Sequence, residues 1–148
     1  FPLIEGKLAK AILTAVTDKL YTPVGLRSLP QDDKRYVGVY GGDAMHRDSA
    51  YHQGTVWSWL LGPYIDAIMK VNGEKGKLMA QIVINDFNYH LNEACIGSVS
   101  EIFDGNAPHH PRGCIAQAWG VAELLRVIKE YELFTLKQPK KTERMAEA

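Results

Sequence analysis

The hydrophobic pattern of the chain predicts four helices separated by two long loops. Residues 2–20 carry apolar side chains on one face at helical spacing and charged residues elsewhere, which predicts an amphipathic outer helix. Residues 53–71 and 114–133 are apolar over most of the helix circumference, which predicts two buried inner helices. Residues 74–94 return to a mixed pattern and predict a second outer helix.

Two glycine- and proline-rich connections separate these helices. The first, residues 21–51, has too many helix breakers for a helix and no sustained alternation, and the second, residues 96–113, is similar. Both lead into the N-terminal ends of inner helices. We therefore expect the two loops to lie at the same end of the helix layer, where loops and helix N-termini can line a pocket.

The order of the elements indicates two αα-hairpins, although no residue-level repeat relates them. Stacked hairpins with a shared inner layer are typical of an all-α solenoid or closed toroid. A four-helix bundle with two irregular loops is the alternative. We expect residues 1–134 to form the helical unit and residues 135–148, rich in Lys and Glu without an apolar stripe, to form a solvated tail.

Composition narrows the classes of partner. With 148 residues, 46% hydrophobic and 23% charged, the chain has the size and character of one folded domain. Its 17 Lys and Arg balance 17 Asp and Glu, so no net charge attracts nucleic acid or an anionic membrane. The longest apolar stretch is too short for a bilayer span and the N-terminus shows no signal-peptide pattern, which favours a soluble, cytoplasmic protein.

Two further observations concern the chemistry and extent of the chain. Cys95 and Cys114 are too few for a disulfide framework and are expected to be buried free thiols. The chain begins with Phe1 rather than Met, so we interpret it as part of a longer protein.

Residues 47–59 combine hydrogen-bonding groups and aromatic rings, a mixture that suits a sugar, whose hydroxyls bond to polar side chains and whose C–H face packs on a ring. Structural interpretations compete with this one. Asp48 can cap a helix or pair with Arg47, and His52 can be an ordinary loop histidine. Trp57 and Trp59 can be core residues, and because they are two positions apart on the predicted helix, at most one should face a ligand.

In the second loop, Glu101 is the candidate for proton transfer. Its apolar neighbours Val99, Ile102 and Phe103 can partly dehydrate the carboxylate, which suits it to proton transfer. Asp104, before a glycine, is interpreted as a turn residue. No metal or cofactor is expected, because adjacent histidines at 109 and 110 point in different directions and no phosphate loop, nucleophile elbow or Cys-His motif occurs.

A series of ordered strings resembles the amylo-α-1,6-glucosidase domain at the C-terminal end of glycogen debranching enzymes. The strings are Leu-Tyr-Thr-Pro-Val-Gly-Leu-Arg-Ser-Leu at 20–29, Tyr-Gly-Gly-Asp at 40–43, Arg-Asp at 47–48, Tyr-His-Gln-Gly-Thr-Val-Trp at 51–57, Glu-Ala-Cys-Ile-Gly-Ser at 93–98, Ser-Glu-Ile-Phe-Asp-Gly at 100–105 and Pro-Arg-Gly-Cys-Ile-Ala-Gln-Ala-Trp at 111–119. The sequence departs from the family pattern at Ser49 and at 44–46. The resemblance implies an (α/α)6 toroid of which this chain forms about the C-terminal third.

The resemblance also implies a substrate and a mechanism. Family members cleave α-1,6-linked glucose at the branch points of glycogen or a similar branched α-glucan, with inversion. Glu101 would be the general base that activates water, and the general acid would lie upstream, outside this chain. The glucose pocket would receive Arg47, Asp48, His52, Gln53 and Trp57.

A second hypothesis is a non-catalytic carbohydrate-binding or structural helical fragment, because the same motifs would serve both. Under the first hypothesis we expect the isolated chain to be inactive, since it lacks the general acid. We also expect inner helices that lack the rest of a toroid to expose apolar patches, which favours self-association.

Overall fold

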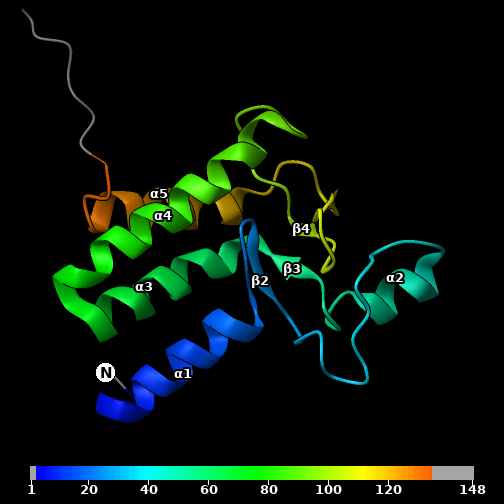
Figure 1. Cartoon of the computed structure of the whole chain (residues 1–148). Helices are drawn as coiled ribbons and strands as arrows, with labels where there is room; N and C mark the ends of the chain where they lie inside the picture. Colours follow the sequence, from blue (N-terminus) through cyan, green and yellow to red (C-terminus); the bar gives the residue numbers. More distant parts are fainter. Residues whose placement is uncertain (1–2, 135–148) are drawn as a thin grey trace, which may run out of the picture.

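The computed structural model describes residues 3–134, which form a mostly helical body with a small sheet at one end (Figure 1). The predicted tail at 135–148 lies outside the described residues. The α-helices are α1 (Gly6–Lys19), α2 (Ala44–Ala50), α3 (Leu61–Asn72), α4 (Lys77–Phe87) and α5 (Ala118–Glu130). Short 3-10 helices are η1 (Ser58–Leu60), η2 (Gly73–Gly76) and η3 (Asn88–Asn92).

The sheet is the main feature that the hydrophobic pattern did not predict. Its five strands pair antiparallel in sequence order: β1 (Tyr21–Thr22), β2 (Gly25–Arg27), β3 (Val56–Trp57), β4 (Ile102–Phe103) and β5 (Pro111–Arg112). The all-α expectation is therefore correct for the helical body and wrong for the two loops. Strands of two or three residues are too short to show the alternation that marks a strand in a sequence.

The helix boundaries also differ from the predicted ones where the sheet begins. The first inner helix was predicted from residue 53, but α3 begins at Leu61, because residues 56–57 pair in the sheet and 58–60 form η1. Trp57 and Trp59 therefore do not lie on one α-helix, and the argument about their shared face does not apply. Trp59 stacks on Trp119 with ring centroids 4.2 Å apart.

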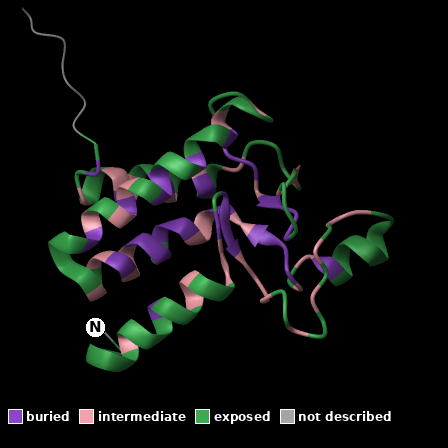
Figure 2. Ribbon diagram, viewed as in Figure 1, coloured by how far each residue is buried: buried purple, intermediate pink, exposed green. Residues whose placement is uncertain are grey.

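Helix α3 is the centre of the helical body. It packs against α1, α4 and α5, and it is the most continuously buried helix in Figure 2. Its buried residues are Leu61, Gly62, Tyr64, Ile65 and Ile68. The second predicted inner helix is less enclosed than expected: α5 buries Leu124 and Val127, but Trp119 is 51% exposed and Leu125 is 62% exposed.

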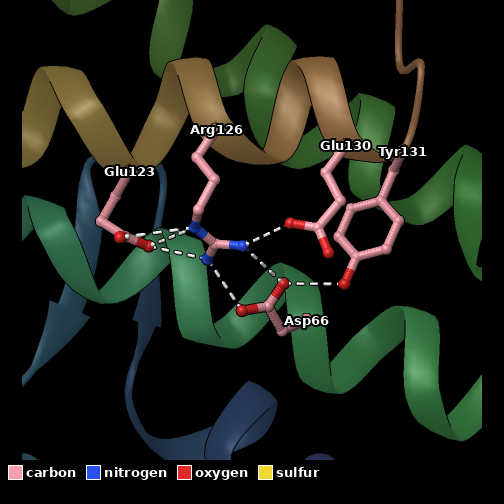
Figure 3. A network of polar contacts seen from close by, with 5 residues as sticks. All are labelled: Asp66, Glu123, Arg126, Glu130 and Tyr131. Carbon is pink, nitrogen blue, oxygen red and sulfur yellow. Dashed lines mark hydrogen bonds and ion pairs between the residues drawn. The ribbon is translucent and has the colours of Figure 1, made fainter.

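A polar network joins α3 to α5 (Figure 3). The Arg126 guanidinium donates to both carboxylate oxygens of Asp66, at 3.1 and 2.8 Å, and also pairs with Glu123 and Glu130 at 2.8 Å. The Tyr131 hydroxyl donates to Asp66 at 2.8 Å. Hydrogen bonds to these carboxylates, the one to Asp66 contributing most, raise the pKa of Arg126. The guanidinium thus links Asp66 on α3 to Glu123 and Glu130 on its own helix, α5.

Apolar side chains remain on the surface of the helical body. On α1, Leu8 is 60% and Ile12 is 42% exposed, and Ile4, two residues before the helix begins, is 44% exposed. Their four-residue spacing places the three side chains along one side of the helix. Apolar grooves run between α1 and α3 and between α4 and α5. Within residues 3–134, each helix is too short or too polar to cross a bilayer.

Replacing Arg126 should destabilise the chain. We expect Arg126→Met to lower the free energy of unfolding by about 1–2 kcal/mol, because three carboxylates lose their shared cation while the exposed position limits the loss. Urea denaturation followed by circular dichroism measures the change. Lys129→Met, at an exposed cation of the same helix, is the control, and equal stability of the two variants would contradict the role of the network.

The exposed apolar side of α1 predicts self-association of the isolated chain. We expect light scattering to show a species larger than 16.5 kDa at high protein concentration, and the double variant Leu8→Gln/Ile12→Gln to shift the distribution toward monomer. A wild-type chain that stays monomeric at every concentration would show that these side chains do not drive association.

Candidate functional site

The antiparallel pairing of β3 with β4 brings the two loops together. Val56 lies opposite Phe103 and Trp57 opposite Ile102. Glu101, the residue before β4, donates its backbone N–H to the carbonyl of Cys114 at 2.9 Å. The segment that leads into α5 therefore lies beside the two loops as well. The prediction that both loops lie at one end of the helix layer is confirmed.

The Glu101 carboxylate accepts two hydrogen bonds. The Tyr51 hydroxyl donates to Oε1, and the backbone N–H of Cys114 donates to Oε2 at 2.9 Å. Gly113 makes the second contact possible, because it has a φ of +67° and a Cβ at this position would lie 2.5 Å from Oε2. The side chain of Glu101 is thus held from both loops while remaining only partly buried.

The sequence neighbours of Glu101 are buried. Val99, Ile102 and Phe103 are at most 2% exposed and belong to the core or the sheet interior. The expectation that these three side chains partly dehydrate the carboxylate stays a prediction, and the hydrogen bonds that the carboxylate accepts come from Tyr51 and Cys114.

An aromatic cluster lies beside Glu101. The Tyr51 ring packs edge-on against His52 and Trp57, with centroids 4.9 and 4.7 Å apart. The His52 imidazole is exposed and lies parallel to the Trp57 indole, at 5.3 Å and an interplanar angle of 3°. The indole N–H donates to the Tyr51 carbonyl at 3.3 Å, and Tyr40 packs on Tyr51 at 5.8 Å. His52 and Trp57 are therefore joined to Glu101 through the Tyr51 ring, and their role as glucose contacts stays a prediction.

Arg47 and Asp48 lie on α2, the short helix that ends just before Tyr51. Both are exposed on α2, which projects away from the helical body in Figure 1. The Arg47 guanidinium donates to the Gly42 carbonyl at 2.6 Å. Asp43 rather than Asp48 caps α2, accepting the His46 N–H at 3.0 Å. The idea that Asp48 is a helix cap is thus wrong.

Gln53 is a structural link between the cluster and the first loop. Its backbone carbonyl accepts the Val37 N–H at 2.6 Å, and its own N–H donates to the Ala50 carbonyl at 2.9 Å. The side chain is partly exposed. Hydrogen bonds to the backbone of residues 37 and 50 thus fix the main chain of Gln53, directly after His52.

Asp104 is more than a turn residue, because its carboxylate connects the two loops. It is 3% exposed, accepts two hydrogen bonds from the Arg112 guanidinium, and accepts the Tyr40 N–H at 2.8 Å. The side-chain hydrogen bond from Arg112 to Asp104 raises the pKa of Arg112. Asp104 ties the first loop to β4 and β5, a role that its position before Gly105 concealed.

The two cysteines and the adjacent histidines add no metal centre. Both cysteines are free thiols, as expected. Neither is fully buried, contrary to the expectation, because Cys95 is only partly buried and Cys114 is exposed. Across residues 3–134, no three His, Cys, Asp or Glu side chains are grouped closely enough to hold a metal ion.

Tyr51 is a hydrogen-bond donor to Glu101 at neutral pH. Partial burial, together with the hydrogen bond to Glu101 and the charge of that carboxylate, raises the pKa of Tyr51 to about 12. The phenol therefore keeps its proton and donates it in a hydrogen bond to the carboxylate. A carboxylate held by two donors retains free lone pairs and can accept a proton from a water molecule.

The raised pKa of Tyr51 predicts a loss of stability at alkaline pH. Its contribution is complete below about pH 10, the ordinary pKa of tyrosine, and is lost as the pH rises through about 12, where a phenolate would face Glu101. Tyr21 and Tyr131, whose pKa values are also raised, add to this loss. We expect Tyr51→Phe to lose less stability between these pH values, by on the order of 1 kcal/mol after solvent screening.

Urea denaturation at about pH 9 and about pH 12 measures this difference. Tyr89→Phe, at a tyrosine that is 77% exposed, is the control. An alkaline loss in Tyr51→Phe as large as in the wild-type chain would show that the phenol and Glu101 are not coupled.

Comparison with known families adds one finding to this geometry. A family model described as amylo-alpha-1,6-glucosidase matches residues 1–126. The match includes both loops, the sheet, the residues around Glu101 and most of α5.

Proposed function

The chain belongs to the amylo-alpha-1,6-glucosidase family, and we propose that it supplies the general base, Glu101, of a glycoside hydrolase that removes α-1,6-linked glucose at branch points of glycogen or a similar α-glucan. The observation that carries the proposal is the Glu101 carboxylate, held by Tyr51 and the Cys114 N–H beside an exposed aromatic cluster. A carboxylate and a ring on one surface match the polar and apolar faces of a hexose.

The proposed reaction is inverting hydrolysis. Glu101 accepts a proton from water as the water oxygen attacks the anomeric carbon, and the glycosidic C–O bond breaks as a second carboxylic acid protonates the leaving oxygen. The two carboxyl groups of such a pair lie about 6.5–9.5 Å apart, which leaves room for the water. We place the acid in an upstream part of the protein, so the chain by itself provides half of the pair.

The surroundings of Glu101 support the role of a base. Tyr51 and the Cys114 N–H orient the carboxylate but do not consume all of its lone pairs, so water can still bind. Positioning of this kind lowers the barrier because the base is already aimed before substrate arrives.

We assign the glucose contacts to two groups of residues. His52 and Trp57 offer a stacked ring surface next to Glu101, and Gln53 follows directly in the chain. Arg47 and Asp48, on the projecting α2, would contact glucan units farther from the reacting bond or the rest of the domain. We expect substitutions at His52 and Trp57 to raise KM more than substitutions on α2.

The helical body fits the proposed architecture. The buried α3 and the half-buried α5 would belong to the inner ring of an (α/α)6 toroid, and α1 and α4, which pack against α3, to its outer ring. Loops that enter the inner helices carry the site. The exposed apolar sides of α1 and α5 would then be covered by neighbouring hairpins of the complete domain.

Glu101→Gln in the complete glucosidase tests the proposal. The amide keeps the shape of the side chain but accepts a proton poorly, so we expect kcat to fall by at least about 1,000-fold while glucan binding and thermal stability change little. Release of glucose from an α-1,6-glucosyl dextrin measures turnover. Glu74→Gln, on η2 at the other end of α3, is the matched control and should retain normal kcat.

Two outcomes would contradict this assignment. Normal turnover of Glu101→Gln would remove Glu101 from the role of base. Glu101-dependent glucose release by the isolated 148-residue chain would show that the acid is not supplied from elsewhere.

A non-catalytic glucan-binding fragment is the second candidate, since the same ring surface at His52 and Trp57 would serve it. Glucan binding by the complete protein, together with the absence of hydrolysis in the wild type, would favour this alternative.

A further inference from the structure

A buried histidine holds the backbone next to Glu101. His90, in η3, is 1% exposed. Its Nε2 accepts the backbone N–H of Ser100 at 3.0 Å, and its Nδ1 lies 3.3 Å from a carboxylate oxygen of Glu93. Thus a side chain outside both loops contacts the residue that immediately precedes Glu101.

The contacts define the tautomer of His90. A ring nitrogen accepts an N–H only when it carries no proton, so Nε2 is unprotonated and Nδ1–H donates to Glu93. Two aromatic rings pack edge-on against the imidazole, Phe87 from α4 and Phe103 from β4, with centroids at 5.5 and 4.6 Å. Burial lowers the pKa of His90, which keeps the ring neutral and able to accept.

The main chain of Ser100 is held on both sides. Its N–H donates to His90, and its carbonyl accepts the Ser58 hydroxyl at 2.9 Å. The Ser100 hydroxyl is buried and makes no hydrogen bond with the residues that the structure describes. The position of Ser100, and with it the start of Glu101, therefore rests on the two main-chain contacts.

We propose that His90 is a positioning residue for Glu101, which acts as a neutral hydrogen-bond acceptor for the Ser100 N–H and so fixes the peptide from which the base projects. The proposal rests on the proposed function of Glu101. It assigns to His90 no contact with substrate. Loss of the acceptor frees the Ser100 N–H, and Glu101 then samples orientations that are not aligned with the attacking water.

Two variants of the complete glucosidase separate the acceptor from the bulk of the ring. His90→Leu fills the site without an acceptor, whereas His90→Gln places an amide oxygen where it can accept the Ser100 N–H. Glu93→Gln is the matched control, because its side-chain oxygen still accepts Nδ1–H. We measure hydrogen–deuterium exchange of peptides that contain Ser100, together with kcat and KM on an α-1,6-glucosyl dextrin.

For His90→Leu we expect at least about 10-fold faster exchange at Ser100, at least about 10-fold lower kcat, and a KM within about threefold of wild type. His90→Gln should restore most of the protection and most of kcat, and Glu93→Gln should resemble wild type. A purely structural role would lower thermal stability together with kcat, or distort the pocket and raise KM, and would not be rescued by the amide.

The outcomes distinguish this proposal from the proposed function. Wild-type exchange at Ser100 in His90→Leu, or rapid exchange with undiminished kcat, overturns the role of His90. If His90→Leu does not fold, His90→Gln decides: near-normal kcat with a protected Ser100, or low kcat with an unprotected Ser100, supports the role. A folded variant in which Ser100 is protected but kcat is strongly reduced, or Ser100 is unprotected but kcat is normal, overturns it. Full activity of Glu101→Gln, by contrast, overturns the assignment of the base and leaves the exchange result on His90 standing.

Discussion

The pairing of β3 with β4 is the contact on which the candidate site depends. It joins Val56 and Trp57 to Phe103 and Ile102, which lie far away in the sequence. Strands of two residues form few ladder bonds, so closure of such long loops needs additional contacts to offset its entropy. Side chains bonded to main-chain groups provide them: Ser58 to the Ser100 carbonyl and Asp104 to the Tyr40 N–H.

The helical body and the site are built as one unit. Helix α3 begins directly after β3 and η1, so the most buried helix starts where the site ends. Helix α5 approaches closely from the other side, because a Cβ at Gly120 would lie 2.8 Å from both Ser58 and Val99. Because Gly120 has no side chain, Ser58 and Val99 can pack directly against α5.

The sequence predicts α1, α3, α4 and α5 and the meeting of the two loops, because long apolar segments have a clear period and connectivity places their entrances together. It does not predict α2, whose seven residues lie in the segment that was expected to be loop. It does not predict the sheet, since each short strand is defined by a partner far away in the chain. His52, Trp57 and Glu101 could be named from their chemistry. The Cys114 N–H could not, because a backbone donor leaves no side-chain signal, and Asp104 was misinterpreted because the glycine after it suggested only a turn.

Tyr51 and His52 are neighbours in the chain, and this adjacency links recognition to reactivity. The phenol reaches back to the carboxylate while the imidazole faces outward on the indole. One short stretch of chain thus supplies both the donor to the Glu101 carboxylate and one ring of the exposed aromatic pair.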